Sequence, residues 1–169
     1  PVTEATQKAA RSFYALSQDR ADSKRYPAVD PIDSYSKYLE YPEMIDYLKE
    51  NIGEKWPAHV QLLKDALLRG RDDSEQINIL GDDGVPVDYH ITFWKSEVMD
   101  FVILQQDAFD KIDAQTSIER QKYMLEKVLN IYHTDFSFEH FEEVNEYFKR
   151  IIDELRQMNY SEFKSDKFQ

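Results

Sequence analysis

The sequence contains no cysteine, which excludes disulfide bonds and cysteine-ligated zinc sites. It also has only 4 glycines among its 169 residues, while 32% of the residues are charged. All-β folds and doubly wound sheets need glycine in their turns, so this scarcity argues against both classes. Because helix-forming residues are abundant, we predict a mainly α-helical protein that is long enough to bury a core.

Long uncharged runs are missing as well. No segment of about 18 uncharged residues occurs that could span a bilayer, and no basic stretch precedes an apolar run as in a secretion signal. The 33 acidic and 21 basic residues give a formal net charge of -12, which repels nucleic acid and anionic lipid surfaces. We therefore predict neither a nucleic-acid partner nor direct membrane insertion. Because the chain opens at Pro1, we interpret it as a piece of a longer protein.

The usual motifs for phosphate and zinc are also absent, namely G-x-x-x-x-G-K-[ST], G-x-G-x-x-G and H-E-x-x-H. No histidine has a second ligand at metal-site spacing, so we interpret each as a surface or packed residue. The histidines are His59, His90, His133 and His140. The acidic pairs at residues 72–73 and 82–83 lack the calcium-loop pattern, and we interpret them as solvated turn residues. We predict no metal site and no catalytic residue in this chain.

The first 40 residues have the least regular pattern. Between Thr3 and Asp22 the apolar residues fit a helical stripe, but residues 12–16 could equally form a short strand, so both alternatives stay open. Between Tyr26 and Tyr38, two prolines and two turn-forming aspartates prevent a continuous helix. We predict an ordered loop for this segment.

Helical patterns dominate from Pro42 onward. An apolar stripe predicts one helix there, and Pro57 at the start of the next stripe predicts a second. Gly70 is expected to end that second helix. Ser74 can then cap a short helix that runs through Leu80.

The second half of the sequence predicts three further elements after a glycine- and aspartate-rich turn at residues 81–86. A long helix follows the turn and extends to about residue 106. Thr116–Glu119 forms a capping box that predicts the start of the next helix. Asp135 or Ser137 can cap the last one.

Two aromatic residues lie in breaks between these elements, and both belong to segments with a family resemblance. Residues 26–38, YPAVDPIDSYSKY, resemble YPAVDPLDSTSR of F-type ATP synthase beta subunits and FPAINWLTSYSLY of V-type A subunits. In both families the aromatic residue before the first proline packs on the adenine ring of bound nucleotide, which implies this role for Tyr26. Residues 101–109, FVILQQDAF, resemble the V-type FLQQNAF, whose last two residues complete the adenine pocket. The resemblance implies that role for Ala108 and Phe109.

Two more segments favour the V-type family. Residues 1–25 resemble EPVTQATLRVVKTFWALDADLARRR, which follows the nucleotide-binding core in V-type subunits. Residues 117–132, SIERQKYMLEKVLNIY, resemble SPEKQYKMLKLILEFY, a helix that the F-type beta subunit lacks. The sequence is identified as the C-terminal part of a V-type (archaeal-type) ATPase catalytic A subunit, or alpha chain. An F-type beta-subunit fragment and a stand-alone helical interaction module are the alternatives.

The sequence departs from the V-type pattern at a few positions. Asp30-Pro31 replaces Asn-Trp, Lys37 replaces a leucine and Asp107 replaces an asparagine. These changes leave the implied base-stacking residues in place. They alter the polarity of the segments that carry those residues.

The resemblance implies a helical bundle preceded by a segment of the nucleotide-binding domain. Residues 1–40 would end that domain and carry its adenine-pocket loop, residues 41–158 would form the C-terminal helical domain, and residues 159–169 a flexible tail. Without its sheet, the strand near residues 12–16 is expected to turn helical, pair with another copy or lie loosely on the bundle.

The resemblance also implies a function for the parent protein, which is ATP hydrolysis or synthesis coupled to H⁺ or Na⁺ transport. ATP or ADP would bind with Mg²⁺, but the P-loop and metal-binding motif would lie upstream. The fragment alone is therefore expected neither to catalyse nor to bind nucleotide tightly. The implied partners are V-type B subunits in an alternating ring and the central rotor stalk, in a cytoplasmic head peripheral to the membrane. In this family the turn that carries Asp82, Asp83 and Asp88 faces the rotor.

Overall fold

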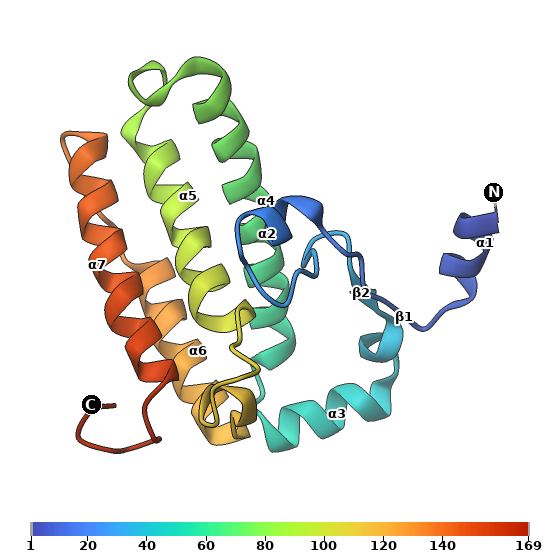
Figure 1. The fold of residues 1–169 in the computed structure, drawn as a ribbon. Helices are drawn as coiled ribbons and strands as arrows, with labels where there is room; N and C mark the ends of the chain where they lie inside the picture. Colours follow the sequence, from blue (N-terminus) through green and yellow to red (C-terminus); the bar gives the residue numbers. More distant parts are fainter. Residues whose placement is uncertain (1, 169) are drawn as a thin grey trace. The chain divides into compact units, whose positions relative to one another are not determined.

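The protein is described by a computed structural model that covers residues 2–168. The chain divides into two compact units, Pro1–Lys64 and Asp65–Gln169, and the division lies inside one long helix, α4 (Trp56–Leu80). Seven α-helices and one two-stranded sheet occur among the described residues, so the predicted mainly α-helical fold is confirmed (Figure 1). The boundary drawn after residue 40 from the resemblance stays a prediction.

The first unit combines short helices with one small sheet. Its elements before α4 are α1 (Val2–Ala9), β1 (Ser12–Phe13), α2 (Gln18–Asp22), β2 (Tyr35–Ser36), the 3₁₀-helix η1 (Lys37–Glu40) and α3 (Pro42–Asn51). Both alternatives for the first 22 residues therefore occur, in succession along the chain. The segment at residues 26–38 is an ordered loop, as predicted, and it ends in β2 and η1.

Strand β1 finds its partner within its own unit. It pairs antiparallel with β2, so that Ser12 lies opposite Ser36 and Phe13 opposite Tyr35, whose rings are 5.8 Å apart. A further bridge joins Leu16 to Val29. None of the three expected outcomes for residues 12–16 included this pairing, which satisfies backbone N–H and C=O groups that would otherwise need another sheet.

Helix α4 is longer than the sequence predicted. It runs without interruption through Gly70 and Ser74, so the predictions that Gly70 ends it and that Ser74 caps a new helix are wrong. Gly70 is buried in the helix interior, where the side chain of Ser96 lies against it. The glycine is thus explained by close packing rather than by a helix end. Asp72 and Asp73 lie in this helix and not in a turn, which corrects their interpretation as turn residues.

The rest of the second unit is a bundle of antiparallel and crossing helices (Figure 1). After the 3₁₀ turn η2 (Asp82–Gly84) come α5 (Val87–Met99), the π-helix η3 (Asp100–Leu104), the 3₁₀ turn η4 (Asp113–Gln115), α6 (Ile118–His133) and α7 (Phe141–Asn159). Helix α5 packs on α7 and α6, and η3 packs on both of them. The buried core residues of these helices include Ile91, Val98, Met99, Val102, Met124, Val128, Val144, Phe148 and Ile152.

Two predicted caps differ in detail. Helix α6 begins after Ser117, whose side chain accepts a hydrogen bond from the backbone N–H of Arg120, so Thr116 is not the cap. The Thr116 hydroxyl instead donates to the carbonyl of Asp113 at 3.2 Å. Helix α7 begins after His140 without a side-chain cap, so neither Asp135 nor Ser137 caps it.

The tail after α7 turns back along the bundle. Phe168 is buried, and its ring lies 5.3 Å from that of Tyr123 in α6 and 5.1 Å from that of Phe163. The sequence analysis, which expected a flexible tail at residues 159–169, did not anticipate the contact with Tyr123, because it joins residues far apart in the sequence. Within residues 2–168, no helix is long and apolar enough to cross a membrane.

Candidate functional site

The loop between η3 and α6 carries two of the predicted site residues, Ala108 and Phe109. We call residues 105–115 the Phe109 loop. Asp107 accepts a hydrogen bond from the backbone N–H of Phe109 at 2.9 Å through Oδ1. Asp110 Oδ1 accepts from the N–H groups of Ile112 and Asp113, both at 2.8 Å. The loop is therefore held in shape by its own carboxylates.

A buried aspartate closes the same loop. Asp113 is only 6% exposed, and its Oδ2 accepts a hydrogen bond from the backbone N–H of Asp107 at 2.6 Å. Its backbone carbonyl accepts a second bond from Nε2 of Gln106 at 2.7 Å. Burial raises the pKa of Asp113 above its ordinary value, although the bond from Asp107 and the charge of Arg120 act in the opposite direction.

Arg120 is the buried cation of this region. Its side chain is 3% exposed and donates from Nη2 to the carbonyls of Met158, at 2.6 Å, and Asn159. Burial lowers the pKa of the Arg120 guanidinium, and the charges of Asp113 and Asp110 partly offset that effect. A buried ion without such partners would cost several kcal/mol, about the effective penalty for burying one charge.

The ring of Phe109 is almost fully exposed on this rigid loop. Its side chain is 98% exposed, and Ala108 beside it is exposed too. Every other phenylalanine in the described part of the chain is more buried, since none of them appears among the exposed large hydrophobic residues. Single exposed apolar rings are common on protein surfaces, so the exposure shows only that Phe109 is not a core residue of this unit.

Tyr26 lies in the first unit, on the loop between α2 and β2. Its side chain is 55% exposed, and its peptide bond to Pro27 is cis. The backbone that follows is fixed by hydrogen bonds from the N–H of Ser17 to the carbonyl of Ala28, at 2.9 Å, and from Asp30 to Ala15, at 2.8 Å. Tyr26 therefore also presents an exposed ring from an ordered loop.

Asp30, one of the departures from the V-type motif, has a structural role in that loop. Its Oδ1 accepts hydrogen bonds from the N–H groups of Ile32, at 2.7 Å, and Asp33, at 2.9 Å. This arrangement is an Asx-type turn, which an asparagine at the same position could also form. The substitution thus preserves the turn that follows Tyr26.

The turn between α4 and α5 carries the three predicted rotor-contact residues. We call residues 79–89 the α4–α5 tip. Asp82, Asp83 and Asp88 are all exposed on it. Gly81 has a φ of 82°, a left-handed conformation that favours glycine, and its carbonyl accepts a bond from the N–H of Gly84 at 3.0 Å.

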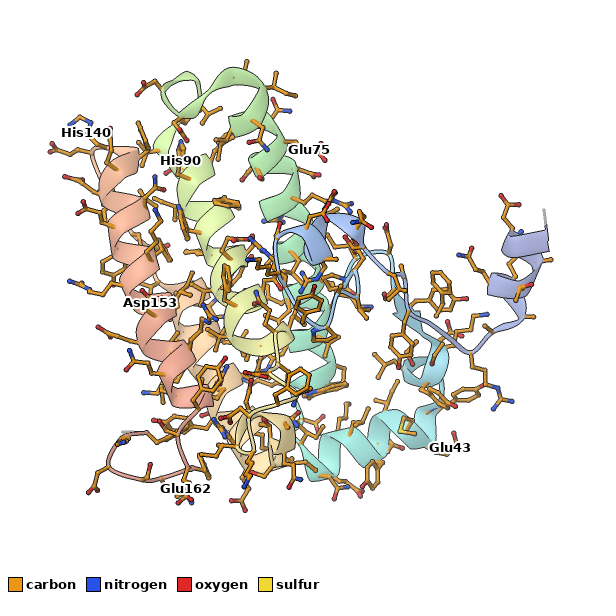
Figure 2. All side chains as sticks on the ribbon, viewed as in Figure 1. Glu43, Glu75, His90, His140, Asp153 and Glu162 are labelled. Atoms are coloured by element: carbon orange, nitrogen blue, oxygen red, sulfur yellow. The ribbon has the colours of Figure 1, made fainter. Side chains whose placement is uncertain are left out.

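The tip is fixed to the bundle by His90. This buried histidine places Nε2 3.0 Å from the carbonyl oxygen of Asp82, and its ring stacks on that of Phe141 at 5.2 Å. Figure 2 labels His90 on α5 close to the tip. The interpretation of His90 as a packed residue is confirmed.

The tip also contains two exposed apolar residues, of which the sequence analysis had placed only Leu80, in a short helix. Ile79 is 73% exposed and Leu80 is 57% exposed, at the end of α4. Their exposure could have been predicted from their place next to the Gly81 turn, because residues in the last turn of a helix extend past the neighbouring helix and have less to pack against. The tip is therefore both acidic and apolar.

A cleft in the same unit lies among α4, α5 and α6 and contains charged residues of both signs. Lys95 donates from Nζ to the carbonyls of Tyr132, at 2.8 Å, and Thr134, at 2.7 Å. Burial lowers the pKa of Lys95, and Asp135 opposes this shift. Burial raises the pKa of Asp73, and the nearby Thr92 hydroxyl opposes this shift. Among residues 2–168 there is no group of three or more potential metal ligands.

Comparison with known proteins finds relatives of one kind. No family profile matches the chain. The V-type ATP synthase alpha chain of Borrelia duttonii (strain Ly) is 34% identical over 171 residues, which cover 99% of this chain and 27% of that protein. The corresponding chain of Protochlamydia amoebophila (strain UWE25) is 32% identical over 168 residues, covering 99% and 28%. This chain is homologous to the V-type ATP synthase alpha chain.

The fold is consistent with that relationship. The solved structure of an ATP synthase subunit, NeqB from Nanoarcheaum equitans, superimposes with a TM-score of 0.58 at 17% sequence identity, over 78% of this chain and 30% of that one. At this identity the likeness concerns the fold alone. The chain spans about a quarter of the length of the curated V-type alpha chains that it matches, and the resemblance to these chains is confirmed.

Proposed function

We propose that this chain is the C-terminal part of the catalytic subunit of a V-type ATPase or ATP synthase, which couples ATP hydrolysis or synthesis to H⁺ or Na⁺ transport. In this proposal the parent binds ATP or ADP with Mg²⁺, and the P-loop and metal ligands lie outside this chain. Tyr26, Ala108 and Phe109 form part of the adenine pocket. The α4–α5 tip contacts the central rotor stalk.

One observation carries the nucleotide part of the proposal, which is the 98% exposure of Phe109 on a loop fixed by internal hydrogen bonds. Adenine needs a flat apolar partner, and stacking on an aromatic side chain contributes about 1–3 kcal/mol per base. Because internal hydrogen bonds already fix the loop backbone, the loop loses little backbone freedom on binding. Phe109 is thus suited to base stacking, and Ala108 leaves room beside it.

The proposed assembly follows from the family and from the shape of the tip. The partners would be V-type B subunits in an alternating ring and the rotor subunits of the stalk, in the cytoplasmic head at the membrane periphery. An acidic tip with exposed Ile79 and Leu80 suits a rotor surface that is basic and partly apolar. A stand-alone interaction module would instead predict no P-loop in the reading frame upstream of Pro1.

The test uses the full-length subunit and compares Phe109→Ala with Phe148→Ala. Phe148 is fully buried in α7, with its ring 5.1 Å from that of Phe136, so its truncation is expected to lower the free energy of unfolding by about 3–5 kcal/mol. Phe109→Ala should change stability by less than about 0.5 kcal/mol, since its ring has almost no packing to lose. Its ATP affinity should fall by about 5- to 100-fold, the range set by one stacked base.

Isothermal titration of ATP into both folded variants provides the measurement. The proposal predicts that Phe109→Ala loses more ATP affinity than Phe148→Ala, whereas Phe148→Ala loses more stability than Phe109→Ala. If both variants bind ATP as tightly as the unmodified subunit does, Phe109 is not part of the adenine pocket.

A further inference from the structure

Asp113 is the residue through which the Phe109 loop closes on the start of α6. It is buried, and it lies in η4, four positions before the cap residue Ser117. Its backbone carbonyl accepts hydrogen bonds from Nε2 of Gln106, at 2.7 Å, and from the hydroxyl of Thr116, at 3.2 Å. The backbone of this residue is therefore held by contacts that do not involve its carboxyl group.

The Asp113 carboxyl group holds the opposite side of the loop. Its Oδ2 accepts a hydrogen bond from the backbone N–H of Asp107 at 2.6 Å, and Asp107 Oδ1 accepts one from the backbone N–H of Phe109 at 2.9 Å. Two successive hydrogen bonds thus lead from the buried carboxyl group to the backbone of the exposed ring. A carboxylate acceptor makes such bonds stronger than bonds between neutral groups.

Asp110, the third carboxyl group of the loop, stabilises a different part of it. Its Oδ1 accepts hydrogen bonds from the N–H groups of Ile112 and Asp113, which both follow it in the chain. These bonds fix the backbone that carries Asp113, whereas the Asp113 carboxyl group fixes the backbone that leads to Phe109. The position of Phe109 therefore depends on Asp113 more directly than on Asp110.

Loss of the Asp113 carboxyl group would leave the backbone N–H of Asp107 without its acceptor. An unpaired N–H in a part-buried place is unfavourable, so this group would turn toward water and move the residues that follow it. Phe109 is two positions further on, and its almost fully exposed ring has no packing that could keep it in place. The position of the ring therefore depends on the backbone hydrogen bonds of the loop.

We propose that Asp113 is a positioning residue for nucleotide binding, which acts through its hydrogen bond to Asp107 to hold the Phe109 ring where adenine stacks. This inference rests on the proposed adenine pocket and adds the buried residue that sets its geometry. Asp113 itself does not touch the nucleotide. Its carboxyl group keeps the loop ordered before binding, so the nucleotide does not have to order it. Loss of this group should reduce recognition of the base and spare recognition of the phosphates.

The experiment measures the affinity of full-length subunit variants for two probes, ATP and inorganic tripolyphosphate. Asp113→Ala removes the carboxyl group and leaves the backbone carbonyl that Gln106 and Thr116 contact. We expect its ATP affinity to fall by about tenfold, within the range of one stacked base, and its tripolyphosphate affinity to stay unchanged. Asp113→Asn keeps an oxygen that can accept from the N–H of Asp107, and it should recover most of the ATP affinity.

Hydrogen exchange of the loop amides tests the same path without a nucleotide. The backbone N–H groups of Asp107 and Phe109 are both hydrogen-bonded, so their exchange requires the loop to open. Asp113→Ala should speed exchange in peptides that cover residues 105–109, Asp113→Asn should restore it, and exchange in the middle of α7 should be the same in all three proteins. Unchanged exchange at residues 105–109 in Asp113→Ala would overturn the proposal.

Ser117→Ala is the matched control. Ser117 lies four positions after Asp113, and its side chain caps α6 by accepting from the N–H of Arg120 at 3.2 Å. Its loss weakens the start of the helix but leaves the hydrogen bonds of Asp107 and Phe109 in place. This variant should be less stable and still show unchanged affinities for both probes. A selective loss of ATP affinity as large as that of Asp113→Ala would contradict the proposal, because any damage beside the loop would then have the same effect.

A double variant decides whether Asp113 acts through Phe109. In the Phe109→Ala background, Asp113→Ala should cause no further loss of ATP affinity, because the ring that it positions is already absent. If Phe109→Ala weakens ATP binding but folded Asp113→Ala binds normally, the positioning role is wrong and the adenine pocket stands. If Phe109→Ala has no effect, the adenine pocket itself is wrong, and the positioning role fails with it.

Asp107→Ala is the deciding variant if Asp113→Ala does not fold. Asp107 is only half-buried, and alanine there removes the acceptor of the Phe109 N–H while its own N–H stays bonded to Asp113. The folded variant should bind ATP more weakly than the unmodified subunit and tripolyphosphate equally well. Asp107→Asn keeps an acceptor oxygen and should bind ATP normally. Equal ATP affinities of Asp107→Ala and the unmodified subunit would overturn the proposal.

Discussion

Gly70 and Ser96 lie against each other where α4 meets α5, with no space for a methyl group between them. A Cβ atom placed on Gly70 would lie 1.9 Å from Oγ of Ser96 and 2.3 Å from its Cβ. The Ser96 hydroxyl is itself fixed, since it donates to the carbonyl of Phe93 at 2.7 Å. The two helices therefore approach closely only because residue 70 has no side chain.

Gly70→Ala should destabilise the chain despite the higher helix propensity of alanine. The propensity gain is about 1 kcal/mol, whereas overpacking a rigid helix contact costs about 1–3 kcal/mol or more. We expect overpacking to dominate, because the clash involves a Cβ atom that cannot rotate away. Urea unfolding followed by circular dichroism measures the difference.

Ser96→Gly in the Gly70→Ala background serves as the control. It removes the clashing atoms from the other helix and should restore part of the lost stability, although glycine in α5 itself costs about 1 kcal/mol. An unchanged or raised unfolding free energy in Gly70→Ala alone would mean that the helices can separate slightly at no cost.

Gly70 shows where local sequence patterns were insufficient to predict the helix boundaries. Glycine is common just past a helix end and rare in a helix interior, so Gly70 predicted an end. The real cause is a contact with Ser96, 26 positions later, which no local pattern contains. By contrast, the helices α3, α5, α6 and α7 were predicted because their apolar stripes are local and continuous.

The candidate site likewise has residues that the sequence predicted and residues that it did not. Tyr26, Ala108 and Phe109 were found through motif resemblance, and the predicted loops that carry them are present. The buried residues Asp113 and Arg120 were missed. The partners of Asp113 lie in its own loop, whereas those of Arg120 lie in α7, up to 39 positions away in the case of Asn159. A charged residue in a sequence is ordinarily assigned to the surface, so burial of this pair could not be predicted.

Asp113→Asn should change how stability depends on pH. Burial raises the pKa of Asp113 above its ordinary 3.8 in the folded chain, so the unfolded chain releases this proton first as pH rises. The folded chain then binds more protons, and its stability falls between pH 3.8 and the raised pKa. Asparagine has no such proton, so the stability of the variant relative to the unmodified chain should rise through that window and then stay constant.

Urea unfolding of both chains at a series of pH values measures this difference. A change in the hydrogen bond to Asp107 shifts the difference in unfolding free energy between the two chains by a constant. It leaves the dependence of that difference on pH unaffected. A difference that falls with pH, or stays flat, would show that Arg120 and Asp107 outweigh burial for this carboxyl group.

Variants of the α4–α5 tip should distinguish the contribution of its charges to rotor assembly from that of its apolar side chains. Exchanging Asp82, Asp83 and Asp88 for asparagine should leave stability and ATP affinity within experimental error, because all three side chains are exposed and exposed pairs contribute only about 0–1 kcal/mol each. Assembly with the stalk should weaken at low salt and approach normal at high salt, where such charges are screened.

Replacing Ile79 and Leu80 with serine should weaken assembly with the stalk independently of salt. Both side chains are more than half exposed, so their loss costs the isolated chain little. Apolar burial against a partner is not screened by salt, and assembly of this variant should therefore be weakened at every ionic strength. The charge-matched control changes three exposed acidic residues away from the tip, as Glu119→Gln, Asp153→Asn and Glu154→Gln.

Native gel analysis of reconstituted heads at two salt concentrations, with ATP titration alongside, gives both readouts. The control triple variant should assemble normally at low salt, which distinguishes a local contact from the effect of net charge. If the tip variants lose ATP binding and still assemble and couple normally, the tip serves the nucleotide site and the rotor contact is wrong. If only the apolar variant fails in assembly, the tip acts through shape and apolar area, with Asp82, Asp83 and Asp88 as solvated residues around it.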